Sequence, residues 1–481
     1  MQYNRNKIIL LASLEFIFII ALYYTPLGLM LQWSLALFSL IAVGIAIKKI
    51  GKFDGWYFVY LVGSKRGLYT MDRFAKKHTL FWQNLAEWGI ILSLGLFSLF
   101  LFRKRLSARI YVIGMLSLII ILFFILPFLS YALPFIELPQ LQNAMASTAS
   151  SSSSYYLSLF GTFISIITGF AGYLLFSLFY NTAAILWGIA AYLLTITAGN
   201  PNHALLTSQM PGVAPIIPGI DIPLVAGIAS LALLLIVHEA SHGVLARVAK
   251  VKLKSTGLLL FGVIPIGAFV EPDEKIVEKA DKMKQTRIFA AGISANFLFM
   301  LIFFLLMLPL LLFVVPGLIQ VQGVYISSTM NGYPAYNVLK PGMQILYWDG
   351  QPVNNLTNLE SIASNDKPGS VVSVTTNTGL YNFIAVASNG SSRGYIGVTV
   401  SEKTAIAQTP YSTIMYFLYT LFALSFMLNF LVGVINLLPL PGFDGWRLYA
   451  INTKKKFLLD IMASAVIFAL LVNLFQWVFF I

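Results

Sequence analysis

The residues best suited to chemistry are two histidines and a glutamate in His238-Glu239-Ala240-Ser241-His242, at the end of an apolar run. On a helix, residues four positions apart lie on one face, so the imidazoles of His238 and His242 can bind the same metal ion. Glu239 lies beside them, where its carboxylate can act as a general base on water. The alternative is a pair of interfacial histidines, but ionisable residues inside a membrane helix are costly and usually functional. The motif therefore predicts a metal-dependent hydrolytic site.

A third ligand is needed, because catalytic zinc sites use three protein ligands and leave one position for water. The chain has no cysteine, and its other histidines, His78 and His203, lack a metal-ligand spacing. A carboxylate is therefore expected, and the best candidate is Asp444 in Asn436-Leu-Leu-Pro-Leu-Pro-Gly-Phe-Asp444. The two prolines prevent a regular helix where a side chain must turn inward. Taken alone, this segment is equally consistent with a simple turn that leaves the bilayer.

Composition places these residues in a membrane protein. Of 481 residues, 58% are hydrophobic and 10% are charged, against about 45–50% and about 25% in soluble proteins. This composition excludes a disordered chain and a soluble globular protein of this size. The net charge of +13 comes from basic clusters beside apolar runs, which indicates membrane loops rather than nucleic-acid binding. These clusters are Lys48, Lys49 and Lys52; Arg103, Lys104, Arg105 and Arg109; Lys250, Lys252 and Lys254; and Lys454, Lys455 and Lys456.

Apolar runs of about 20 residues predict the membrane spans. We expect a polytopic α-helical membrane protein with about 9–10 spans and one inserted soluble α/β domain. The stretch 54–63 is too short to cross and is expected to be interfacial, and the serine-rich segment 138–154 is expected to be a solvated loop. The expected spans are 8–24, 29–46, 80–102, 110–134, 156–178, 180–199, 222–246, 288–315, 411–438 and 457–481.

The segment 317–405 is rich in Gly, Ser, Asn and Thr and contains short alternating β patterns,. It resembles a PDZ domain through Pro334-Ala335, Leu339-Lys-Pro-Gly342, Ile345-Leu346 and the hairpin turn Asp349-Gly350,. The alternative is another small β-rich domain. The PDZ resemblance implies peptide binding by addition of a strand to a sheet edge. No carboxylate-binding loop is evident, which puts recognition of C-termini in doubt.

Two motifs together resemble the site-2 protease family of intramembrane zinc metalloproteases. These are H-E-x-x-H in one span and N-x-x-P-x-P-x-x-D-G in a later one, supported by Gly292-Ile-Ser-Ala-Asn296-Phe297 in the span between. The segment 257–270 is similar to the family's membrane-dipping β-hairpin, although Ala268 stands where a second glycine is common. The resemblance implies Zn²⁺ held by His238, His242 and Asp444, with Glu239 as the catalytic base.

The resemblance also implicates Asn436 and Asn296 in substrate binding. A buried amide can donate to a peptide carbonyl or to a developing oxyanion. The alternative is hydrogen bonding between helices, which for Asn296 is as strong an interpretation as the functional one. The expected domains are 1–200, a transmembrane region of unknown role; 201–316, the first half of a protease core; 317–405, the PDZ-like domain; and 406–481, the second half of the core.

Basic residues give a consistent topology. If 222–246 runs inward, 247–254 is cytoplasmic, the PDZ-like domain lies outside, and Asp444 returns to the cytoplasmic side,. We therefore expect a multi-pass cell-membrane protein whose active site lies toward the cytoplasm. The sequons at Asn355 and Asn389 would then be exposed to glycosylation.

The sequence predicts an intramembrane zinc metalloprotease acting on transmembrane proteins in the bilayer, without nucleic acid as a partner. One alternative is a catalytically silent zinc-binding adaptor that binds partners through its PDZ-like domain, but Glu239 has no use in a structural site. A transporter would show internal repeats or paired broken helices, which the sequence lacks. A protease of prenylated proteins is expected to take its third ligand from a Glu-rich motif, and none is present.

Overall fold

The computed structural model describes residues 2–64, 66–102, 106–127, 152–207, 209–214, 216–387, 393–453 and 455–479. The chain divides into two compact units: one runs to Leu306 and resumes at Thr420, and the other is Met307–Tyr419. Residues 138–151 of the expected serine-rich loop, the basic residues 103–105 and the sequon at Asn389 lie outside the described residues.

The first unit is a helical membrane domain. Among the described residues, seven helices are long and apolar enough to cross a membrane. The chain is thus a polytopic α-helical membrane protein with a small additional α/β unit, as the sequence predicts. The seven segments are Leu31–Gly51, Ala108–Ile125, Phe160–Thr197, Leu224–Val248, Ala291–Leu318, Pro410–Ile435 and Lys456–Phe479.

The α-helices and their bounds are as follows. They are α1 (Gln2–Tyr23), α2 (Leu29–Gly51), α3 (Arg66–Lys77), α4 (Thr79–Leu94), α5 (Phe97–Phe102), α6 (Ala108–Ile120), α9 (Ser152–Thr197), α10 (Leu224–Val248), α11 (Glu274–Lys279), α12 (Lys282–Phe289), α13 (Ala291–Pro309), α14 (Val315–Leu318), α15 (Leu356–Ala363), α16 (Pro410–Ile435), α17 (Asp444–Asn452) and α18 (Lys456–Gln476). Short π-helical segments, Ile121–Ile125 and Leu310–Val314, continue α6 and α13.

The count of seven differs from the expected nine to ten at three places. Helix α1, at the first expected span, is not among the seven segments. The expected span 80–102 is interrupted at Gly95, which has a positive φ of 54° and separates α4 from α5. The two expected spans between residues 156 and 199 belong to one continuous helical element, α9.

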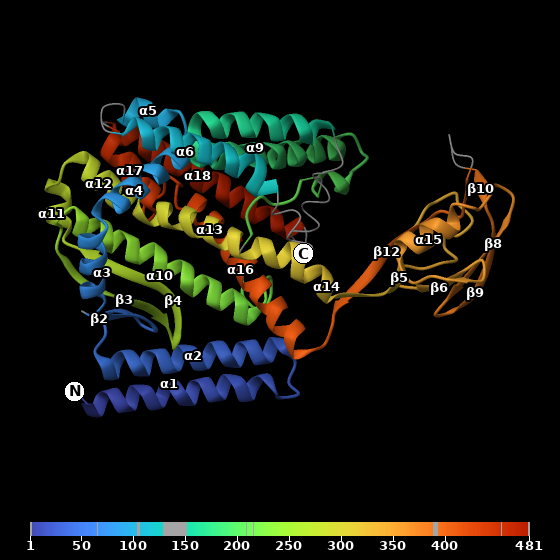
Figure 1. Cartoon of the computed structure of the whole chain (residues 1–481), viewed down its shortest axis with the longest axis horizontal. Coiled ribbons are helices and arrows are strands. Elements are labelled where there is room, and N and C mark those ends of the chain that lie inside the picture. Colours follow the sequence, from blue (N-terminus) through green and yellow to red (C-terminus); the bar gives the residue numbers. More distant parts are fainter. Residues whose placement is uncertain are drawn as a thin grey trace. The chain divides into compact units, whose positions relative to one another are not determined.

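Helix α9 reverses its direction at Gly169, about ten residues before the expected break. The φ and ψ angles of Gly169 are 66° and −166°, and the rings of Phe160 and Phe176 lie only 5.3 Å apart. Figure 1 shows the two halves side by side. A Cβ on Gly169 would lie 2.3 Å from the backbone of Ser93, so the reversal packs directly against the end of α4 and requires glycine.

A four-stranded antiparallel sheet in the first unit joins segments that are 200 residues apart in sequence. Its strands are β1 (Gly55–Trp56), β2 (Val59–Ser64), β3 (Leu253–Phe261) and β4 (Ile264–Pro272), in that order across the sheet. The register of β2 on β3 runs from Val59 opposite Phe261 to Ser64 opposite Thr256. The hairpin β3–β4 lies where the sequence predicts it, but the sequence did not predict its partner β2. Among the described strands β4 pairs only with β3, so its outer edge is free.

The sheet lies between α2 and α10, as Figure 1 shows. Tyr60 of β2 is almost fully buried and its hydroxyl donates to the carbonyl of Gly262 at 2.6 Å, at the hairpin turn. The N-terminal region thereby holds the hairpin at its β3 edge, opposite the outer edge of β4.

The second unit contains the described strands of the expected PDZ-like segment. They are β5 (Ile319–Thr329), β6 (Gln344–Trp348), β7 (Gln351–Pro352), β8 (Val371–Thr376), β9 (Gly379–Ile384), β10 (Val386–Ala387), β11 (Gly394–Tyr395) and β12 (Val398–Ile406). The main sheet has the order β12-β5-β6-β8-β9, and β7 pairs with β6.

The hairpin turn of the second unit matches its sequence signal. Asp349 and Gly350 both have positive φ, 49° and 74°, as the predicted turn requires,. Strand β5 is paired on both sides, so the described outer strands of the main sheet are β12 and β9. Peptide addition to this unit, which stays a prediction, would therefore need one of those two edges.

Candidate metal centre

The two histidines of the motif lie on one face of α10, as four-residue spacing on a helix requires. Their Nε2 atoms are 3.3 Å apart. Both side chains are largely buried, with exposed fractions of 9% for His238 and 14% for His242. Two imidazoles that share a buried face in this way can ligate one ion.

Asp444 reaches the same point from the other half of the chain. Helix α16 ends at Ile435, the proline-containing loop follows, and Asp444 is the first residue of α17. Its Oδ2 lies 3.3 Å from Nε2 of His238 and 3.2 Å from Nε2 of His242. The structure thus brings together the three residues that the sequence singled out as ligands.

The loop before Asp444 is held by its own hydrogen bonds. The amide of Gly445 donates to the carbonyl of Asn436 at 2.7 Å, and the hydroxyl of Tyr449 donates to the carbonyl of Leu437 at 2.8 Å. A Cβ on Gly445 would lie 2.6 Å from the Leu437 carbonyl. Glycine is required there, which gives the Asp-Gly pair in the motif a structural reason.

The spacing of the three donor atoms fits a zinc ion. Bonds of about 2.0–2.1 Å in a tetrahedral site place neighbouring N and O ligands roughly 3.3–3.4 Å apart, and the observed separations are 3.2–3.3 Å. Oδ2 of Asp444 is buried and has no hydrogen-bond partner, which is costly unless a cation binds there. Within the described parts of the chain, no other group of three His, Cys, Asp or Glu residues has this arrangement.

One ligand is oriented by a second contact. Nδ1 of His242 lies 2.8 Å from the carbonyl of Ile288, near the end of α12. Because that oxygen can only accept, we assign the proton to Nδ1, which leaves the lone pair of Nε2 for a metal. Nδ1 of His238 is buried and has no such partner. The two histidines are therefore held unequally.

A largely buried ion pair lies next to Ile288 in the sequence. The preceding residue, Arg287, donates from Nε to Oε1 of Glu87 at 3.1 Å and also from Nη2 to the same oxygen. The exposed fractions are 20% for Arg287 and 5% for Glu87. Glu87 belongs to α4, so this pair joins the N-terminal region to the residue before Ile288, whose carbonyl contacts His242.

Helix α13 passes directly beside the ligands at Gly292. A Cβ on this residue would lie 2.4 Å from Cε1 of His238 and 2.4 Å from Nε2 of His242. The glycine of the G-x-x-x-N-F segment therefore leaves the space in which the imidazoles meet.

The two asparagines lie in different surroundings. Asn296, one turn after Gly292, is completely buried and neither of its amide atoms has a partner. The side-chain amide nitrogen of Asn436, which follows the end of α16, donates to the carbonyl of Val432 at 3.1 Å. Asn296 thus has unused hydrogen-bonding capacity close to the ligands, and a substrate-binding role for either residue stays a prediction.

Comparison with known proteins identifies the family. A family model described as peptidase family M50 matches residues 226–474, which include all three candidate ligands and Glu239. The chain belongs to peptidase family M50. This is the site-2 protease family that the motifs resemble, so the predicted membership is confirmed.

A relative of this M50 chain is an uncharacterized protein of Methanocaldococcus jannaschii. The two are 30% identical over 230 residues, which cover 47% of this chain and 57% of the relative. The match thus spans less than two thirds of that protein.

Proposed function

We propose that this M50 peptidase is an intramembrane zinc metalloprotease that hydrolyses peptide bonds of transmembrane proteins. The observation that carries the proposal is the convergence of His238, His242 and Asp444. Glu239 lies on the helix of the two histidines and in the wall of a cavity.

The chain's own residues supply ligation and proton transfer. His238, His242 and Asp444 would hold the zinc ion, which when bound polarises a carbonyl and makes water more acidic. Glu239 takes a proton from the attacking water as oxygen adds to the peptide carbonyl carbon. The carboxyl group of Glu239 then returns this proton to the nitrogen as the C–N bond breaks. Water is consumed and two chain ends are released.

The substrate segment must be extended before it is cut. A transmembrane helix satisfies its carbonyls internally, so the scissile bond becomes accessible only after local unwinding. The free edge of β4, which packs against α10, offers backbone groups that can pair with such a segment. This proposal favours substrates with helix-breaking residues near the scissile bond.

Glu239→Gln separates catalysis from metal binding. We expect wild type and variant to bind about one zinc per chain, and the variant to cleave a model transmembrane substrate in detergent at least about 100-fold more slowly. Zinc content by elemental analysis and cleavage by mass spectrometry provide the two readouts. Glu278→Gln, an exposed position on α11, is the matched control and should retain activity.

Each other outcome has a distinct meaning. Equal cleavage by wild type and Glu239→Gln would refute the catalytic role of Glu239. Zinc in both without cleavage by either, over a panel of substrates, would favour the silent adaptor. Absence of zinc from the wild type would contradict the metal assignment.

We also propose that the second unit is extracytoplasmic and that the metal centre lies toward the cytoplasm, because basic residues follow the end of α10,. The chain has no cysteine, so single cysteines report orientation cleanly. In intact cells an impermeant thiol reagent should label Lys340→Cys and should not label Lys252→Cys until the cells are opened. The reverse pattern would overturn this orientation.

A further inference from the structure

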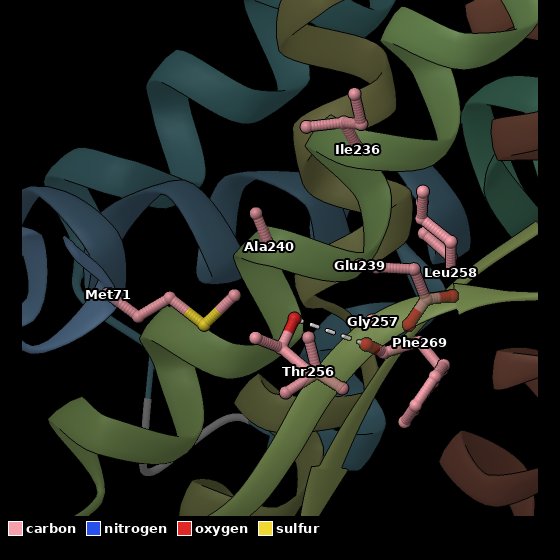
Figure 2. A pocket seen from close by; sticks show the side chains of 10 residues that line it. Met71, Ile236, Glu239, Ala240, Thr256, Gly257, Leu258 and Phe269 are labelled. Atoms are coloured by element: carbon pink, nitrogen blue, oxygen red, sulfur yellow. Dashed lines mark hydrogen bonds between the residues drawn. The ribbon is translucent and has the colours of Figure 1, made fainter. Parts of the chain in front are cut away.

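A small cavity opens between α10 and the sheet, beside the proposed catalytic base. Its volume is about 220 Å³, and its walls come from α10, β3 and β4 together with Met71 of α3. Figure 2 shows Glu239 and Leu258 on one side of it and Met71 and Ala240 on the other. The N-terminal region therefore supplies one wall of a cavity that reaches the catalytic glutamate.

Met71 is held firmly in this wall. It is 8% exposed, and a Cβ on Gly243 of α10 would lie 2.4 Å from its sulfur atom. The next residue, Asp72, forms an ion pair with Arg247 of α10 at 2.8 Å. Helix α3 is thus fixed against the end of α10 that carries the histidines, and the thioether of Met71 lies in the notch left by Gly243.

The cavity suits one apolar side chain. Its volume is below the roughly 300–1,000 Å³ of sites for small-molecule ligands. Glu239 is its one charged lining residue, and the hydroxyl of Thr256 already donates to the Phe269 carbonyl at 3.3 Å. The other lining side chains are aliphatic, aromatic or sulfur-containing, apart from one glycine. Apart from Glu239, which the proposed mechanism uses for proton transfer, the walls offer few partners to a polar side chain, so burying one there costs free energy,.

We propose that this cavity is the subsite for an apolar substrate side chain next to the scissile bond, and that Met71 sets the size of the side chain accepted. The inference rests on the proposed proteolytic function, because a carboxylate that moves protons to the scissile nitrogen must lie within reach of it. The residue bound in the cavity is therefore within a position or two of the cut.

Substrate preference gives the first test. The cleavage site of a model transmembrane substrate is mapped by mass spectrometry, and each flanking position is then changed to Ala, Leu, Phe or Trp. At one substrate position, Met71→Ala should enlarge the cavity and raise kcat/KM for the Trp substrate relative to the Leu substrate by about tenfold. Ala268→Leu should make the cavity smaller and raise kcat/KM for the Ala substrate relative to the Leu substrate by about the same factor. Tyr69→Ala, on the exposed side of α3 (75% exposed), should leave the wild-type order unchanged. Preferences that stay the same in Met71→Ala and Ala268→Leu would overturn the subsite.

Cross-linking gives a second test that does not depend on turnover. Since the chain has no cysteine, Met71→Cys combined with Glu239→Gln creates a single thiol beside the cavity. With single cysteines placed along the substrate and an added oxidant to accept the two electrons, a disulfide should form at one position, within about two residues of the mapped cut. Tyr69→Cys combined with Glu239→Gln should give none.

The outcomes separate this inference from the function on which it rests. Cleavage by the wild type without a cross-link to Met71→Cys at any position would overturn the subsite and leave the protease intact. Failure of the wild type to cleave any substrate would overturn the proposed function and this inference with it.

Discussion

Replacing Gly292 with alanine is expected to lower zinc affinity by at least about 100-fold, because the added methyl group needs the space in which the ligands meet. Its Cβ would lie 2.4 Å from ring atoms of both His238 and His242. The His242 ring is held by Ile288, and both rings extend from a buried face of α10, so neither can move away cheaply. Loss of an orienting contact alone costs about 10–100-fold in affinity, and displacing two ligands should cost more.

Competition with a zinc chelator measures this effect in purified protein. Gly317→Ala is the matched control, because a Cβ there has nothing within 4 Å, and its affinity should equal that of the wild type. Size-exclusion chromatography and thermal unfolding without zinc establish that both variants fold. A folded Gly292→Ala protein with wild-type affinity would show that the ligands do not meet beside α13.

The convergence of the three candidate ligands could be predicted because their residue types are rare in apolar segments. His238, Glu239 and His242 need only helical periodicity to lie together, and Asp444 was found because a carboxylate had to complete the set. The role of Gly292 could not be derived in this way. A glycine in a span is consistent with many kinds of close packing, and only the structure shows that imidazoles fill the space beside it.

Long-range pairing escaped prediction for a different reason. Hydrophobic patterns report local periodicity, whereas the partner of a short strand is set by tertiary contacts. The stretch 54–63 therefore gave no indication that Val59–Ser64 pairs with β3, although both segments could be located separately. The reversal at Gly169 was misplaced because an apolar run does not mark where two helices join.

One usable signal was present and overlooked. Glu87 is the single charged residue in the expected span 80–102, and an acid in such a position is a functional candidate by default. Applying that rule would have marked Glu87 as a candidate residue within 1–200, but its partner Arg287 is evident only in the structure. Met71 gave no comparable signal, because a methionine on the apolar face of a helix is ordinary core.

Removing the carboxylate of Glu87 is expected to reduce both stability and zinc affinity. In Glu87→Ala the largely buried Arg287 loses its partner, and breaking a buried pair in this way costs about 3–5 kcal/mol. Arg287 directly precedes Ile288, whose carbonyl orients His242. We therefore also expect zinc affinity to fall by about 10–100-fold, as for loss of an orienting contact. Glu271→Ala breaks the exposed Lys254–Glu271 pair and, as the control, should leave the stability close to that of the wild type.

A double variant distinguishes orientation from stability. In Glu87→Met with Arg287→Met no charge is left buried, so the free energy of unfolding should return close to the wild-type value. If the ion pair positions the Ile288 carbonyl, zinc affinity stays low in this restored protein, and a cobalt-substituted sample shows an altered ligand-field spectrum. Recovery of zinc affinity together with stability would mean that the pair only holds α4 and α12 together. The N-terminal region would then support the metal centre by packing, and the orientation of His242 would depend on α12 alone.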